Sequence, residues 1–214
     1  MTQALDVSTF TVGAFAENAY LIRYADADQA ILIDPGAEAQ RLIDEIEARG
    51  VTVAAILVTH THVDHIGAVA ALAGHTGAPV YAPLLERDAL VTGETGLGRV
   101  TPHEPEHLLA GGEQLELAGL PIDVRFTPGH SAGHLTYAIP SAAAIFCGDV
   151  LFAGSVGRVD LAGGDWQTLL ASIAQLLERY PGETVVHPGH MSTTTLARER
   201  ETNPFLSELR SLPA

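Results

Sequence analysis

The sequence contains few basic residues. It has 11 Lys and Arg against 26 Asp and Glu, which gives a formal net charge of −15 at pH 7. The basic residues are scattered along the chain and form no local cluster. A polyanion such as nucleic acid, or an anionic membrane surface, would be repelled by this charge. We therefore expect neither nucleic acid nor a membrane among the partners of this protein.

The sequence also lacks a second cysteine and any apolar run long enough to span a membrane. The single cysteine, Cys147, excludes an internal disulfide and fits a reducing compartment. The longest apolar runs have the length of strands, and no basic segment followed by an apolar one opens the chain. We therefore expect no transmembrane helix and no signal peptide, and we predict a cytoplasmic protein.

Length and composition favour a globular chain with one core. Hydrophobic residues make up 47% of the sequence and charged residues 17%, which is typical of folded rather than disordered proteins. A chain of 214 residues fits one large α/β core and leaves no room for a full second domain. We predict a single domain over residues 1–214, and the sequence does not predict the oligomeric state.

Strand and helix patterns are mixed in both halves of the chain, which indicates a layered α/β fold. Strands are predicted at residues 5–12, 19–24, 30–34, 54–58, 79–82 and 184–187, with several more between 114 and 149. Helices are predicted around residues 42–46, over 66–72, after Asp165 as N-cap, and at the end of the chain from Asn203-Pro204. Residues 84–105 are interpreted as an irregular surface insertion.

The most informative segment is the run from Thr59 to His65, which contains three histidines and one aspartate directly after an apolar strand pattern. Imidazole nitrogens and carboxylate oxygens are ligands that zinc, iron and manganese accept. His60 and His62 lie two apart in extended chain, so they point the same way and can share one ion. Asp64 and His65 follow where the chain turns helical, so they suit a second ion nearby.

Three later segments can supply the missing ligands. His130 follows Thr127-Pro128-Gly129, Asp149 follows Cys147-Gly148, and His190 follows Pro188-Gly189. Each segment is an apolar strand pattern, then glycine, then a ligand-type side chain. In α/β sheets the loops at the strand ends build the functional sites.

These motifs, taken in this order, resemble the metallo-β-lactamase superfamily, and the matched positions span residues 60–190. The resemblance implies an αββα sandwich, with two mixed sheets packed face to face and helices outside. It also implies two divalent metal ions, zinc in the first place, with iron or manganese as alternatives. The implied ligands are His60, His62 and His130 for the first metal, Asp64, His65 and His190 for the second, and Asp149 for both.

The stretch from Gly148 to Asp160 narrows the resemblance to the glyoxalase II-like branch, the hydroxyacylglutathione hydrolases and their short bacterial relatives. Residues 200–206 are similar to those short relatives in particular. In the hydroxyacylglutathione hydrolases a basic residue aligned with Arg158 contacts glutathione, so Arg158 is a candidate for substrate binding. Those enzymes place a tyrosine where this chain has Asp160, and the longer ones carry an additional helical domain. The identity of the thiol is therefore left open.

The implied activity is hydrolysis of a small thioester by a metal-bound hydroxide, since a metal ion lowers the pKa of bound water toward ~7. Asp64 would orient the hydroxide and Asp149 would set the spacing of the ions. The same motifs fit an alternative, a persulfide dioxygenase with one iron on His60, His62 or His130 and Asp149. A non-catalytic metal-binding protein, a β-lactamase and a nuclease fit the sequence less well.

Other residues have weaker signals. Asp34 before Pro35-Gly36 is either a turn residue or a hydrogen-bond partner of a liganding imidazole. His134 could support His130. Cys147 shares a strand face with Asp149 by simple alternation, yet a cysteine in an apolar strand is most often core filling. The remaining four histidines have no motif around them and are interpreted as structural or surface residues: His75, His103, His107 and His187.

Overall fold

The computed structural model describes residues 4–209, and its core consists of two six-stranded sheets. In bonded order the first sheet is β1 (Leu5–Val12), β2 (Glu17–Tyr24), β3 (Gln29–Ile33), β4 (Thr52–Leu57), β5 (Val80–Pro83) and β6 (His107–Leu109). The second is β14 (Thr194–Thr195), β13 (Val185–Pro188), β10 (Ala144–Gly148), β9 (Leu135–Ile139), β8 (Leu120–Phe126) and β7 (Gln114–Leu117). Both sheets are mixed, with parallel and antiparallel pairs.

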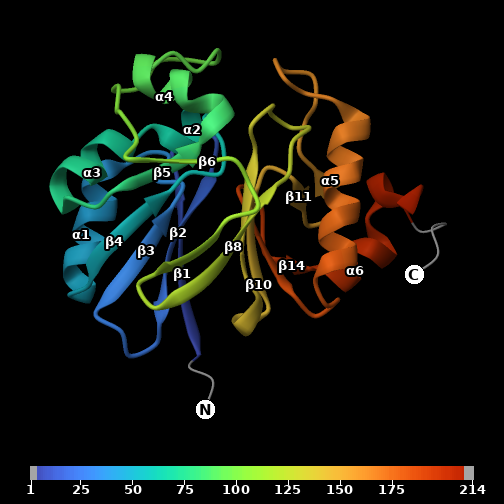
Figure 1. The fold of residues 1–214 in the computed structure, drawn as a ribbon, viewed down its shortest axis with the longest axis horizontal. Coiled ribbons are helices and arrows are strands. Elements are labelled where there is room, and N and C mark those ends of the chain that lie inside the picture. The colour runs from blue at the N-terminus through green and yellow to red at the C-terminus, as the bar shows by residue number, and fades with distance from the viewer. Residues whose placement is uncertain (1–3, 210–214) are drawn as a thin grey trace.

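Helices cover the outer face of each sheet (Figure 1). α1 (Ala39–Arg49) and α3 (Val69–Thr76) lie outside the first sheet, and α5 (Trp166–Arg179) and α6 (Leu196–Thr202) lie outside the second. α2 (Val63–Ile66) and α4 (Arg87–Thr92) lie at one end of the sheets. The remaining elements are the hairpin β11 (Leu151–Phe152) and β12 (Ser155–Val156), and the 3₁₀ turns η1 (Leu84–Glu86), η2 (Pro140–Ala142) and η3 (Pro204–Leu206). The predicted αββα sandwich is confirmed.

The apolar residues form three layers because side chains alternate along each strand. In β3, Ile31 and Ile33 face the interior shared by both sheets, whereas Ala30 and Leu32 face α1 and α3. In β10, Phe146 faces the shared interior and Ile145 faces α5. Strands buried on both faces explain the continuous apolar runs of the sequence.

Strand direction brings the candidate ligands to one end of the sandwich. β8 and β10 are both antiparallel to β9, so they run the same way, and β13 is parallel to β10. Their C-terminal ends, which precede His130, Asp149 and His190, therefore meet at one edge of the second sheet. The end of β4, which precedes His60, faces them from the first sheet.

Cys147 lies in the layer between the second sheet and α5, fully buried among apolar side chains. Burial raises the pKa of its thiol to about 12. Asp149 does not share its face, because Gly148 has a left-handed backbone (φ 46°) that ends the strand alternation and turns Asp149 toward the ligand loops. The interpretation of Cys147 as core filling agrees with this position.

Three expectations about local structure were wrong. Residues 84–105 are not wholly irregular, since they contain η1 and α4. The helix expected over 66–72 is two helices, α2 and α3, because the N–H of Ala68 donates to the carbonyl oxygen of Pro35 (2.9 Å) instead of continuing the helical hydrogen bonds. Asn203 and Pro204 begin only the short turn η3, and the longer helix α6 precedes them.

None of the helices within residues 4–209 combines the length and the apolar character needed to cross a bilayer.

Candidate metal centre

Three imidazoles from two loops converge at the end of the sandwich. His60 and His62 come from the loop between β4 and α2, and His130 comes from the loop after β8. The nitrogens His60 Nε2, His62 Nδ1 and His130 Nε2 form a triangle with sides of 3.1, 3.2 and 2.9 Å. We call these residues the three-histidine group. The prediction that His60 and His62 point the same way agrees with this geometry.

The orientations of His60 and His130 are fixed by hydrogen bonds from their other ring nitrogens. Thr59 Oγ1 donates to Asp34 Oδ2 (2.6 Å), so it accepts from the Nδ1–H of His60 (3.1 Å). The Nδ1–H of His130 donates to the carbonyl oxygen of Arg158 (2.8 Å). Both Nε2 atoms therefore carry lone pairs, and they face each other without a proton between them.

This arrangement suits a cation. Two facing lone pairs repel each other unless a positive charge lies between them. Zinc takes imidazole nitrogens at about 2.0–2.1 Å in tetrahedral geometry, which corresponds to ligand atoms about 3.3 Å apart. The observed triangle is close to this spacing, so the three-histidine group could hold one divalent ion.

Asp64, His65 and His190 form the second group that could hold an ion. Their ligand atoms lie within 4.8 Å of one another, and His190 Nε2 is 3.4 Å from Asp64 Oδ2. The Nδ1–H of His65 donates to Asp34 Oδ2 (2.9 Å), which leaves His65 Nε2 as the atom that faces the site. Asp34 thus orients an imidazole in each group, which decides between the two interpretations of this residue.

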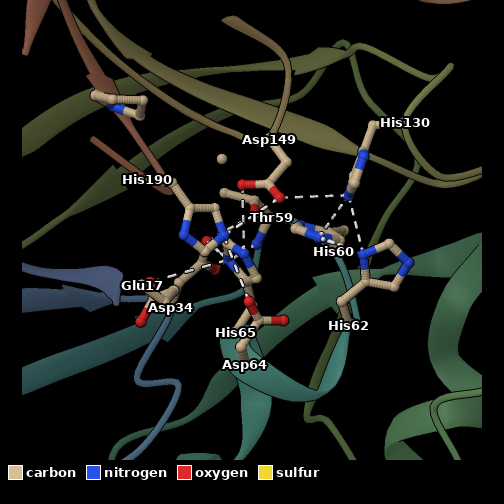
Figure 2. A network of polar contacts seen from close by, with 12 residues as sticks. Glu17, Asp34, Thr59, His60, His62, Asp64, His65, His130, Asp149 and His190 are labelled. Atoms are coloured by element: carbon tan, nitrogen blue, oxygen red, sulfur yellow. Dashed lines mark hydrogen bonds and ion pairs between the residues drawn. The ribbon is translucent and has the colours of Figure 1, made fainter. Parts of the chain in front are cut away.

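Asp149 lies between the two groups (Figure 2). Its Oδ2 is 3.5 Å from His130 Nε2 and 3.5 Å from His190 Nε2, and its Oδ1 is 3.4 Å from His65 Nε2. Asp149 Oδ1 and His65 Nε2 are both buried without a hydrogen-bond partner. Buried polar atoms without partners are costly and call for an explanation. A divalent ion on each side of Asp149 would satisfy them.

In the metal-free protein, the histidines of the two groups differ in their pKa values and therefore in their protonation near pH 7. Burial lowers the pKa of His60 and His130, and that of His62 to about 4, so these rings are neutral near pH 7. Burial also opposes protonation of His65 and His190, but neighbouring carboxylates outweigh the effect of burial on these two residues. The charge and hydrogen bonds of Asp149 and Asp34 raise the pKa of His65, and hydrogen bonds to Asp149 and Asp64 raise that of His190 to about 9.

Two glycines allow the close approach of backbone and ligands. A Cβ at Gly148 would lie 2.4 Å from Thr59 Oγ1, and a Cβ at Gly189 would lie 2.3 Å from Asp149 Oδ1. Neither position can accept a side chain without moving a residue of the site. This explains why glycine precedes Asp149 and His190 in the sequence.

Glu86 joins the two loops of the three-histidine group, and sequence reasoning missed it. Its Oε2 accepts from the N–H (2.7 Å) and Oγ1 (3.0 Å) of Thr61, next to His60 and His62. Its Oε1 accepts from Ser131 Oγ (2.5 Å) and from the N–H of Gly133 (2.8 Å), on either side of the turn after His130. Glu86 comes from η1, in the segment expected to be irregular, and no local pattern marks its partners.

Glu17 is a second residue that the sequence did not reveal. It is fully buried at the start of β2, its Oε1 lies 3.9 Å from His65 Nδ1, and neither carboxylate oxygen has a hydrogen-bond partner. Burial raises its pKa well above the usual value, with further contributions from Asp34 and Asp149. No local pattern marks it, since it stands between Ala16 and Asn18, just before the strand expected at residues 19–24.

His134 supports Asp149 rather than His130. Its Nε2 accepts from the backbone N–H of Asp149 (3.1 Å), and its ring stacks on His60 with centroids 4.8 Å apart. The four motif-free histidines lie outside both groups. His75 and His103 lie near glutamates, His107 stacks on Tyr81, and His187 stacks on Phe146.

Arg158 lines the cavity above the two groups, together with His62, Asp64 and His190. Its guanidinium is exposed and makes two hydrogen bonds of 2.7 Å to Asp160, one to each carboxylate oxygen. Its carbonyl oxygen holds His130. The side chain is therefore near the site but already paired with Asp160.

Fold and site together define a metal-dependent enzyme of the hydrolase type, with His and Asp clusters that suit divalent ions. The chain belongs to the metallo-beta-lactamase superfamily, because the sequence model of that family matches residues 12–190.

Relatives of known sequence support this assignment. A probable metallo-hydrolase of Bacillus subtilis, YqgX, is 38% identical, with 92% of this chain and 95% of the relative covered. The hydroxyacylglutathione hydrolase GloC of Haemophilus influenzae is 34% identical, with 95% and 99% covered.

Two solved structures share the fold over nearly their whole length. The B3 metallo-beta-lactamase BLEG-1 has a TM-score of 0.88 at 38% identity, with 94% of this chain and all of that chain covered. TTHA1623, crystallised in a di-iron-bound form, has a TM-score of 0.82 at 42% identity with the same coverage.

We expect Glu86→Gln to weaken zinc binding about tenfold, since the amide can offer only one acceptor oxygen to two loops and the loops hold His60, His62 and His130. Chelator competition measures the affinity, and a thermal melt measures the stability. Glu104→Gln is the matched control, because Glu104 pairs with Arg87 on the surface beside Glu86. A lower melting temperature with unchanged zinc affinity would assign Glu86 to folding alone.

Metal binding should release protons from the group of Asp64, His65 and His190 but not from the three-histidine group. Near neutral pH His65 and His190 are protonated in the metal-free protein, whereas the three-histidine group is not. Affinity at the second group should therefore rise with pH across the neutral range and through the pKa of His190, about 9, while affinity at the first stays flat above the lowered pKa values of its histidines. Calorimetry in buffers of different ionisation enthalpy counts the protons. Release of equal numbers of protons on binding of the first and the second metal equivalent would contradict this prediction.

Proposed function

We propose that this protein is a metal-dependent hydrolase that cleaves the thioester of a small thiol, as hydroxyacylglutathione hydrolases do. The observation that carries the proposal is the position of Asp149 between two ligand groups on the floor of a cavity. The similarity to GloC over almost its whole length supports the thioester as substrate class. Thiolate is a good leaving group that needs little protonation, so the cavity need not supply a general acid.

In this proposal His60, His62 and His130 would hold one divalent ion, and Asp64, His65 and His190 would hold the other. Asp149, which lies between the two groups, would be available to either ion. Zinc is our first choice, and iron remains open because TTHA1623 was crystallised with two irons. Such ions lower the pKa of water and polarise a carbonyl oxygen.

The chain's own residues would position the reactants. Asp64 is half-buried and faces the cavity, and its hydrogen bond with His190 outweighs burial and lowers its pKa, so it is a carboxylate that can accept a hydrogen bond from water. Asp149 stays ionised because the neighbouring imidazoles outweigh its burial and hold its pKa well below the usual value. Asp34, Thr59 and the Arg158 carbonyl keep the imidazoles in the tautomers that face the site.

Two other activities use the same residues and serve as comparisons. A persulfide dioxygenase needs two histidines and one carboxylate around iron, which the His60, His130 and Asp149 side chains could provide. A β-lactamase activity is suggested by the similarity to BLEG-1.

The proposal is tested by assaying the metal-loaded protein against three substrates: S-lactoylglutathione, glutathione persulfide with oxygen uptake, and a chromogenic β-lactam. We expect thioester cleavage to dominate. Asp149→Asn should lower metal content and reduce turnover by more than about a hundredfold. Asp123→Asn, in a carboxylate paired with Arg179 away from the site, is the control. Oxygen uptake or β-lactam cleavage without thioester cleavage would overturn the proposal, and a fully active Asp149→Asn protein that retains its metal would overturn the site.

Arg158 gives a separate prediction about the thiol end of the substrate. Arg158→Ala should raise KM for an anionic thioester on the order of tenfold, with a smaller change in kcat and little change for a neutral thioester. Since Asp160 holds the guanidinium, Asp160→Ala should lower the same KM. Equal losses for anionic and neutral substrates in Arg158→Ala would mean that Arg158 only holds its loop and His130.

A further inference from the structure

The cavity above the two ligand groups has apolar walls. Its volume is about 370 Å³, and its floor contains His62, Asp64, His130, Asp149 and His190. The surrounding wall is formed by Phe15, Leu97, Phe152, Val156, Leu161 and Met191. Sites of this kind bind the apolar part of a ligand through the walls and fix the reacting group through a few polar atoms.

Three of these side chains are exposed to an unusual degree for apolar residues. Phe15 is 66% exposed, Leu97 50% and Met191 59%. They come from three separate segments: the loop between β1 and β2, the segment after α4, and the loop after β13. Exposed apolar side chains that gather at one rim, rather than singly, mark a binding surface.

Met191 is held at this rim in a strained conformation. Its φ is 68°, in the left-handed region that non-glycine residues rarely adopt. Its carbonyl oxygen accepts from Asn18 Nδ2 (2.8 Å), and Asn18 itself is buried beside the site. This hydrogen bond stabilises a strained backbone conformation that leaves the apolar side chain of Met191 exposed to solvent. Such strain at a cavity rim points to a ligand that covers the side chain.

A larger hollow of about 790 Å³ adjoins this cavity and shares Phe15 and Asp64 with it. Much of its wall is apolar, including Val12, Val63 and Pro102. Two charged side chains besides Asp64 line it, and each has a partner: Arg99 pairs with Glu94, and Glu38 pairs with Arg41. The chain contains no lysine that could add a mobile positive charge. The lining of this hollow is therefore mostly apolar, with its charged side chains paired at the surface.

We propose that the acyl group of the substrate is an elongated apolar chain, which runs from the ligand groups past Phe15 into the larger hollow. The inference rests on the proposed thioester hydrolysis. The thiol part then lies on the side of Arg158, which lines the smaller cavity and not the larger hollow. Phe15 is the specificity-determining residue, since it forms part of both walls.

The experiment compares acetyl, butanoyl, hexanoyl and octanoyl esters of one neutral thiol, N-acetylcysteamine. Burying a methylene favours binding about threefold to fourfold, so kcat/KM should rise on the order of a hundredfold from acetyl to octanoyl when burial is incomplete. Phe15→Ser should remove most of this rise, and Met191→Ser part of it. Phe205→Ser is the matched control, because Phe205 is an exposed phenylalanine beside Trp166 that lines neither the cavity nor the larger hollow.

A binding measurement separates this inference from the proposed function. S-octyl- and S-methyl-N-acetylcysteamine are thioethers that cannot be hydrolysed, and calorimetry gives their affinities directly. Tighter binding of the S-octyl compound that Phe15→Ser abolishes supports the apolar acyl site even when no thioester is cleaved. Equal affinities, or a kcat/KM that does not depend on chain length, would overturn it. Absence of cleavage of all esters would overturn the thioester hydrolase alone.

Discussion

The Asp34 carboxylate is the contact on which the rest of the site depends. It lies at the end of β3 in a left-handed conformation (φ 47°), which aspartate tolerates better than most residues. Its oxygens accept from the N–H and Oγ1 of Thr59 and from the Nδ1–H of His65. Through Thr59 it also fixes the tautomer of His60. One buried carboxylate thereby anchors the whole histidine-rich loop to the neighbouring strand and aims an imidazole into each ligand group.

The layered fold could be predicted because its strands and its helices α1 and α5 carry strong apolar periodicity. The β1 boundaries agree with the expected residues 5–12, and Asp165 caps α5 by accepting from the N–H of Thr168. The prediction failed where that signal is weak. α4 contributes only Leu90 to the core, and α6 buries only Leu196 and Glu199, so neither segment has an apolar stripe from which a helix could be inferred.

The ligand groups could be predicted for a different reason. Each member stands in a short local pattern at the end of a strand, and β-sheet geometry brings those ends together, so His130, Asp149 and His190 meet although the chain separates them widely. Glu86 and Glu17 had no such pattern. Glu86 acts through contacts with residues 25 to 47 positions away, and such contacts exist only once two loops have folded against α4 and η1. Supporting residues are defined by tertiary contacts, whereas ligands are defined by their own chemistry.

The balance of charge explains why the site calls for cations. Asp34, Asp64 and Asp149 lie close to His65, and in the metal-free protein protons on His65 and His190 offset their charge, while burial favours the neutral, protonated form of Glu17. Burying ionised groups is costly unless they are paired, so these protons stabilise the metal-free fold. Divalent ions would replace these protons and carry more positive charge. They would also satisfy the facing lone pairs of the three-histidine group, whose rings are neutral near pH 7. Metal binding and the stability of this end of the sandwich would therefore be linked, and displacement of the protons on His65 and His190 would be the thermodynamic cost of that exchange.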